Sequence, residues 1–111
     1  MSTPYVVVST TVASNEDARE IAEKVLGERL AACVQMLAIS SLYTWKGAIA
    51  HENEVLLLLK TRAELYPELE RLIVSVHKYE TPEIVMLPVS QGLPGYLGWI
   101  DDVTRDGRQE R

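Results

Sequence analysis

The chain is poor in cysteine and in basic residues, and each shortage narrows the range of functions. Cys33 is the single cysteine among 111 residues, so no disulfide can form within one chain. Eleven Lys and Arg stand against sixteen Asp and Glu, which gives a formal net charge of −5. Nucleic acids and anionic membranes favour a basic surface, so neither is expected as the main partner. A cation or another protein suits this charge better.

Long hydrophobic runs and internal repeats are also lacking. No apolar run approaches the ~20 residues that cross a bilayer, and nothing recurs at a fixed period. The start, Met1 to Tyr5, lacks the basic and apolar regions of a signal peptide, so we expect a cytoplasmic protein. A hydrophobic content of 47% suits a single domain over residues 1–111, with a core at about 5–100 and a charged, frayed tail at 104–111.

Local patterns divide the chain into strands and amphipathic helices. β-Branched and aromatic runs indicate strands, a capping serine with acidic residues behind it indicates a helix start, and apolar residues every three or four positions indicate a buried helix face. The expected elements are a strand at 5–11, a helix from Ser14 to about Leu30, strands at 33–45 and about 54–62, a helix from Pro67 to His77, a strand at 84–89 and a short segment at 96–100.

The two middle strands predict an unusually long hairpin. Neither proline nor glycine occurs from Cys33 to Trp45, and Lys46-Gly47 makes a plausible tight turn. Thirteen extended residues reach ~40 Å, about twice a usual strand, so part of the hairpin is expected to project beyond the domain. The run from Val55 to Leu59 is apolar on both sides of the sheet, and helices can cover only one of them.

The element order is that of a ferredoxin-like, split βαβ α+β fold, with one antiparallel sheet and both helices on the same face. The other face is apolar as well, so we expect an obligate homo-oligomer that buries it. Four large aromatic residues in the hairpin and the terminal segment are expected to anchor the contacts between subunits: Tyr43, Trp45, Tyr96 and Trp99.

The stretch from His77 to Glu83 holds the densest group of candidate ligands. An imidazole, a phenol and two carboxylates surround Pro82, which stops any preceding helix. In one interpretation these polar groups face water, and His77 interacts with the last helix carbonyls. In the other, His77, Tyr79 and Glu83 line a cleft between subunits and bind a cation or a polar ligand.

Three further residues have both a structural and a functional interpretation. Cys33 lies among apolar neighbours, where a cysteine is usually a small buried hydrophobe, although thiolate and imidazole are also strong copper ligands. Glu54 begins an apolar strand and is either a solvated strand end or a ligand. Lys60 ends that strand and could attract an anion, but no glycine-rich loop supports a nucleotide site.

Taken together, several separate motifs resemble the CutA divalent-cation tolerance family over about residues 5–100. They are Glu28-Arg29-Leu30-Ala31-Ala32-Cys33-Val34, Ser41-Leu42-Tyr43-Thr44-Trp45-Lys46-Gly47, Glu54 through Lys60-Thr61, His77-Lys78-Tyr79-Glu80-Thr81-Pro82-Glu83-Ile84 and Tyr96-Leu97-Gly98-Trp99. The resemblance implies a ferredoxin-like homotrimer, similar to the PII signal transducers, in which long hairpins join three sheets.

The resemblance also implies a link to metal ions, without a settled chemical reaction. Some members bind Cu(II), and the ligands proposed in a bacterial member are two cysteines and a glutamate. Cys33 and Glu54 match the second cysteine and the glutamate, whereas Thr10 stands in place of the first cysteine and is a poor ligand for a soft metal. The chain also has Leu37-Ala38 where the family commonly has Pro-Gly.

Three functions are therefore compared. The first is a non-enzymatic trimer that binds Cu(II) or another divalent cation through Cys33, Glu54 or His77, with no organic cofactor. The second is a PII-like sensor that binds a small polar metabolite between subunits, with Lys60, His77, Tyr79 and Glu83 as candidate contacts. The third is an enzyme with Cys33 as nucleophile and His77 as base, which the apolar setting of the cysteine disfavours.

Overall fold

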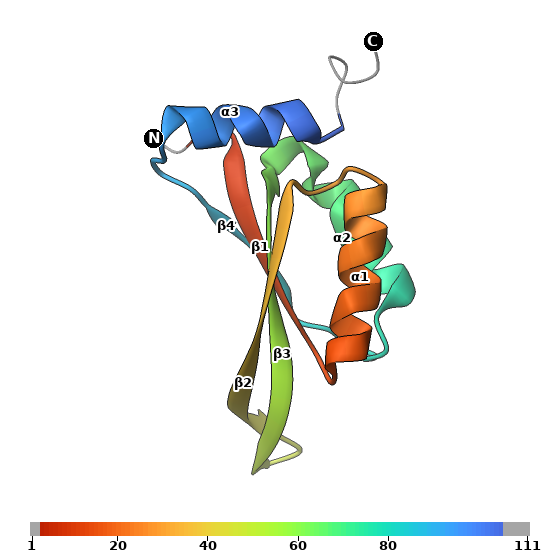
Figure 1. Ribbon diagram of the computed structural model, residues 1–111. Coiled ribbons are helices and arrows are strands. Elements are labelled where there is room, and N and C mark those ends of the chain that lie inside the picture. Colours follow the sequence, from red (N-terminus) through yellow and green to blue (C-terminus); the bar gives the residue numbers. More distant parts are fainter. Residues whose placement is uncertain (1–2, 106–111) are drawn as a thin grey trace.

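A single antiparallel sheet organises the molecule (Figure 1). The computed structural model describes residues 3–105. The four strands are β1 (Tyr5–Val12), β2 (Cys33–Trp45), β3 (Ala48–Arg62) and β4 (Ile84–Pro88). Their order in the sheet is β2-β3-β1-β4, so the first and third strands lie side by side at the centre. This is the ferredoxin-like α+β arrangement that the sequence predicts.

Two helices pack on one face of this sheet, and a third crosses one end of it (Figure 1). They are α1 (Asn15–Gly27), α2 (Tyr66–Val76), which follows a short 3-10 turn at Ala63–Leu65, and α3 (Pro94–Val103). The Ser14 side chain accepts a hydrogen bond from the Asp17 N–H at 3.1 Å, which confirms the predicted helix cap. The last helix is longer than the segment expected at 96–100.

The core lies between the sheet and the first two helices. Side chains of β1 and β3 that alternate along the strands point toward α1 and α2, and Val8, Leu57 and Leu59 are fully buried there. The opposite side of the sheet, here called the open face, is not covered by α1 or α2 (Figure 1). Its apolar residues include Leu37, 47% exposed, and Leu87, 52% exposed. Both sides are apolar, as the sequence predicts.

The β2–β3 hairpin projects beyond the helices and gives the molecule dimensions of 49 × 29 × 21 Å (Figure 1). Lys46 and Gly47 both have positive φ, 51° and 79°, as a type I′ turn requires. The expected start of β3 at about Glu54 is wrong. Residue-by-residue pairing continues from the turn, where Trp45 pairs with Ala48, so β3 includes the whole arm of the hairpin.

The end of the chain departs from the expected frayed tail at two residues. Thr104 is fully buried, and the N–H of Arg105 donates to the carbonyl of Arg29 at 2.7 Å. A charged sequence was expected to remain in water, but here it supplies partners to a buried arginine, Arg62. The rest of the predicted tail, residues 106–111, lies outside the described residues.

Candidate functional site

His77 begins the polar segment by ending α2 and contacting the sheet. Its backbone is extended at the helix end. Nε2 lies 2.8 Å from the carbonyl oxygen of Thr11, and Nδ1 accepts the N–H of Tyr79 at 3.1 Å. These contacts assign the neutral tautomer with its proton on Nε2. Both ring nitrogens are therefore engaged by backbone groups, and the ring holds the segment against β1.

Tyr79 joins this segment to β3. Its hydroxyl donates to Oε2 of Glu54 at 2.9 Å, and its ring centroid lies 4.9 Å from that of His77. Burial, with the Glu54 hydrogen bond as the second cause, raises the pKa of Tyr79 to about 12. The phenol is thus a hydrogen-bond donor throughout the physiological pH range, and it fixes one oxygen of the Glu54 carboxylate.

The next residues of the segment contact β1 and α1. The hydroxyl of Ser9 donates to Oε2 of Glu83 at 3.4 Å. On the other side, Lys78 Nζ lies 2.6 Å from Oδ1 of Asp17 and 3.5 Å from Oε1 of Glu20. The hydrogen bond from Lys78 is the main cause that lowers the pKa of Asp17 below 3.8. Residues 77–83 are therefore held from both sides.

The structure brings together some of the predicted site residues and separates others. Glu54, Tyr79 and His77 form one cluster at the hairpin side of the sheet. Cys33 instead pairs with Lys60, whereas Glu54 pairs with Ile39. Six residues of extended strand separate the two positions, which corresponds to ~20 Å. Within the described range, 3–105, no group of three His, Cys, Asp or Glu residues is placed to hold a metal ion.

The remaining candidates are Cys33 and Lys60, near the Arg62 end of β3, and Thr10 on β1. Cys33 is half-buried, and Nζ of Lys60 lies 5.7 Å from the ring centroid of Tyr96 on α3. Thr10, at the position of the missing cysteine, is fully buried on the helix side of the sheet. Its hydroxyl has no hydrogen-bond partner among the described residues. A nucleophile–base pair of Cys33 and His77 is not formed within one chain.

A hollow beside Glu54, with both polar and apolar lining, is not predicted by the sequence. It has a volume of about 410 Å³ and lies between the β1–α1 turn and the two arms of the hairpin. Its lining residues are Ala13, Ser14, Asn15, Ala38, Ile39, Ser40, Asn53, Glu54 and Val55. Ser40 donates to Asn53 at 3.3 Å across the hairpin. No short motif marks this hollow, because it depends on the register of β2 against β3.

Comparison with known proteins gives the family. The family model described as CutA1 divalent ion tolerance protein matches residues 6–103. The chain belongs to this family. Protein CutA of Mus musculus is 46% identical over 95 residues, which are 85% of this chain and 54% of that protein. The divalent-cation tolerance protein CutA of Thermus thermophilus is 42% identical over 99 residues, 88% of this chain and 96% of that protein.

Solved structures of CutA proteins share the fold. The periplasmic divalent cation tolerance protein CutA from Archaeoglobus fulgidus has a TM-score of 0.89 and 35% identity, with 91% of this chain and 99% of that chain covered. The ferredoxin-like architecture and the CutA resemblance are therefore confirmed. This chain spans about half the length of the mouse relative. Among the helices of residues 3–105, none is long and apolar enough to cross a membrane.

Proposed function

We propose that this CutA-family chain forms a homotrimer that binds a divalent cation, Cu(II) or a similar ion, without catalysing a reaction. Its role would be in the response of the cytoplasm to metal ions. The observation that carries the proposal is the Glu54 carboxylate, held by Tyr79 at the hairpin side of an uncovered apolar sheet face. The CutA family is named for divalent ion tolerance rather than for a reaction, which supports the choice of ligand.

The apolar open face supports self-association. Leu37 and Leu87 are each about half exposed on it, and the hairpin adds Trp45 on the same side. Leu42 and Ile49, which are more exposed still, lie on the other side of the hairpin. Apolar surface of this kind on adjoining elements indicates contact with another protein. A second and third copy in a closed ring bury the same surface on every chain. The aromatic residues of the hairpin and of α3 then lie at the contacts.

The cation would be shared between chains, because residues 3–105 of one chain do not gather a complete ligand set. Tyr79 occupies Oε2 of Glu54, which leaves Oε1 to a cation. His77 would have to give up its bond from the N–H of Tyr79 before Nδ1 could bind a metal. Cys33 would have to come from a neighbouring copy. Carboxylate and imidazole donors suit Cu(II), and thiolate suits Cu(I).

A chelator-buffered calorimetric titration with Cu(II) tests the proposal. Glu54→Gln should weaken Cu(II) binding by at least about tenfold. Glu52→Gln is the matched control, because it removes the same charge on the same strand and Glu52 does not accept the Tyr79 bond. Cys33→Ser and His77→Ala then assign the other ligands. Equal affinity of wild type and Glu54→Gln would reject the site, and a monomer in sedimentation equilibrium would reject the trimer.

The hollow beside Glu54 favours a second function, a PII-like sensor of a small polar metabolite. Ser14, Asn15, Ser40 and Asn53 offer it hydrogen-bonding groups. Of the contacts expected for such a ligand, Tyr79 and His77 lie near Glu54, Glu83 contacts Ser9, and Lys60 would come from another copy. A ligand that binds the folded protein raises its melting temperature. Stabilisation by polar metabolites in the presence of a chelator, with no stoichiometric Cu(II) binding, would select the sensor.

A further inference from the structure

Helix α3 is attached to the sheet with little apolar contact. Ile100 is its one buried residue in the range Pro94–Val103. Leu93, Tyr96 and Trp99 remain substantially exposed. Among residues 3–105, the main core cluster draws on the strands, α1 and α2 but includes no side chain of α3. Hydrophobic burial alone therefore holds α3 on the sheet more weakly than it holds the other two helices.

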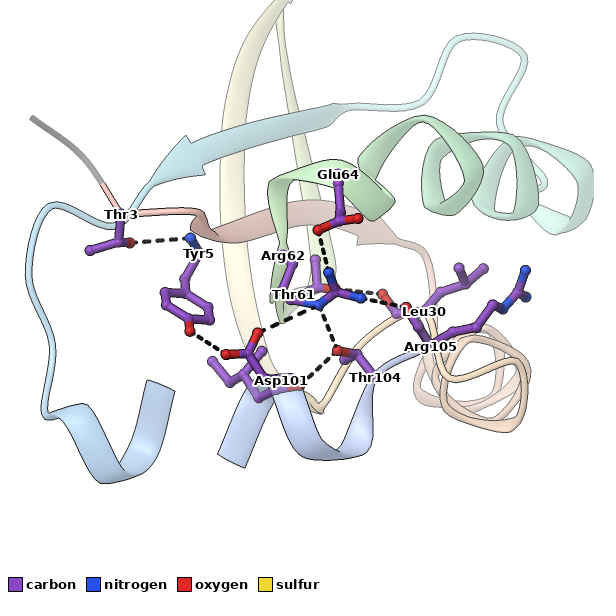
Figure 2. Close-up of polar contacts among 10 residues, drawn as sticks. Thr3, Tyr5, Leu30, Thr61, Arg62, Glu64, Asp101, Thr104 and Arg105 are labelled. Carbon is purple, nitrogen blue, oxygen red and sulfur yellow. Dashed lines mark hydrogen bonds and ion pairs between the residues drawn. The ribbon is translucent and has the colours of Figure 1, made fainter. Parts of the chain in front are cut away.

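A polar network centred on Arg62 supplies the missing attachment (Figure 2). Arg62 is 4% exposed. Its Nε donates to Thr104 Oγ1 at 3.0 Å and lies 3.8 Å from Oδ1 of Asp101, and its Nη2 donates to the carbonyl oxygen of Arg105. The Tyr5 hydroxyl donates to Oδ2 of Asp101 at 2.5 Å. A buried guanidinium needs such partners. Asp101, Thr104 and the Arg105 carbonyl belong to α3 or follow it directly, whereas Glu64, which also contacts Arg62, lies on the 3-10 turn.

The segment after α3 extends this attachment to the other helices. The Thr104 hydroxyl donates to the carbonyl of Ile100 at 2.7 Å, which ties Arg62 to the helix backbone. Arg105 Nη1 lies 2.5 Å from Oε2 of Glu68, and Nη2 lies 3.0 Å from Oε1 of Glu28. These outer pairs are more exposed than Arg62 and are correspondingly weaker. The buried guanidinium is the centre of the network.

The position of α3 determines what covers one end of the open face. Arg62 and Lys60 are two residues apart on β3, so their side chains point to the same side of the sheet. Lys60 Nζ lies 5.7 Å from the ring centroid of Tyr96 on α3. In the sheet, Lys60 of β3 is the register partner of Cys33 on β2. Movement of α3 would therefore remove the Tyr96 ring from Lys60.

We propose that α3 is a separately releasable cap on the Arg62 end of the open face, and that Arg62 is the residue that positions it. Release of the cap leaves the sheet, α1 and α2 folded, because their shared core does not include α3. It also displaces Tyr96 and Trp99, so its effect on assembly rests on the trimer proposed above. The Arg62 network itself lies within one chain, but in the proposed trimer the contacts of Tyr96 and Trp99 would have to open with it.

Hydrogen exchange on the full chain tests the cap. Arg62→Met, Thr104→Val and Tyr5→Phe each remove part of the network, and the amides of α3 should exchange about tenfold faster or more, while those of β1 and β3 change little. Glu64→Gln is the control. Glu64 contacts Arg62 Nη1 at 2.5 Å from the exposed 3-10 turn, so its loss should leave exchange in α3 nearly unchanged.

Two results would overturn the cap. One is that the amides of α3 exchange at the wild-type rate in both Thr104→Val and Tyr5→Phe. These two variants decide the question if Arg62→Met does not fold. The other is loss of protection in β1 and β3 in step with α3, which would make the helix part of the common core. Sedimentation equilibrium of the wild type is read separately. A monomer there would reject the trimer, and the exchange of α3 would still decide the cap.

Discussion

The Tyr79 hydroxyl donates a hydrogen bond of 2.9 Å to Glu54 across 25 residues of sequence. This contact links the segment that ends α2 to the hairpin, and it orients the carboxylate proposed to bind the cation. The acceptor is a carboxylate and the donor is partly buried, so the bond should stabilise the fold as well as the site.

Tyr79→Phe removes this donor and should lower the free energy of unfolding by about 1–2 kcal/mol, the range for a hydrogen bond to a charged group. Tyr66→Phe is the matched control. The Tyr66 hydroxyl donates to Glu70 at 2.7 Å, but within one exposed helical turn, and its loss should cost less than about 0.5 kcal/mol. Urea unfolding at equal protein concentration measures both. Equal losses would show that the Tyr79 bond has no special role.

The same bond predicts a stability loss at alkaline pH. The pKa of Tyr79 is raised to about 12 from an ordinary 10, chiefly by burial. A raised folded pKa means that the protonated phenol is favoured in the folded state, so its contribution is complete below pH 10 and is lost as the pH rises toward 12. Unfolding followed from pH 9 to 12 should be less steep with pH in Tyr79→Phe. An unchanged slope would contradict the predicted effect of burial.

Asp17 predicts the opposite behaviour in acid. The hydrogen bond from Lys78 lowers the pKa of Asp17 below 3.8. A lowered folded pKa stabilises the protein above the unfolded value, and the contribution disappears as the pH falls through the folded one. Asp17→Asn should flatten the acid limb of the stability curve below about pH 4. Glu23→Gln, at the exposed Arg19–Glu23 pair, should leave that limb nearly unaltered.

Much of the fold could be predicted because its signals are local. The Ser14 cap, the β-branched run of β1 and the Lys46-Gly47 turn each act over a few residues. Several site contacts could not be predicted, because they depend on register. The pairing of β2 with β3 places Cys33 at one end and Glu54 at the other, and neither position has a sequence signal for the distance between them.

The C-terminal residues show another limit of local patterns. Charged residues near a chain end usually remain in water. Thr104 and Arg105 are instead held by Arg62, which is buried at the end of β3. A buried arginine requires partners, but the sequence does not show that Arg62 is buried until the strand register is known. The attachment of α3 to the sheet through Arg62 could therefore not be predicted. The helix itself lies where aromatic and apolar residues indicated a segment.

Two glycines should respond to alanine with opposite signs. Gly47 has a φ of +79° in the hairpin turn, where a Cβ is strained, and Gly47→Ala should cost about 1 kcal/mol. Gly27 ends α1 without positive φ and has no atom within 4 Å of an added Cβ, so Gly27→Ala should stabilise by about 0.5 kcal/mol. Denaturant midpoints give both signs. Stabilisation by Gly47→Ala would exclude the left-handed turn.

The two sides of the sheet should respond differently to loss of apolar side chains, and this difference tests assembly most directly. Leu57 is fully buried against the helices, and Leu57→Ala should cost about 2–5 kcal/mol of folding free energy. Leu37 lies on the open face, 47% exposed, so Leu37→Asp adds little strain to a single folded chain. If copies pack on that face, the buried carboxylates make association unfavourable, and sedimentation equilibrium should show a folded monomer. A Leu37→Asp protein that remains trimeric would place the contacts elsewhere and would leave the apolar open face without an explanation.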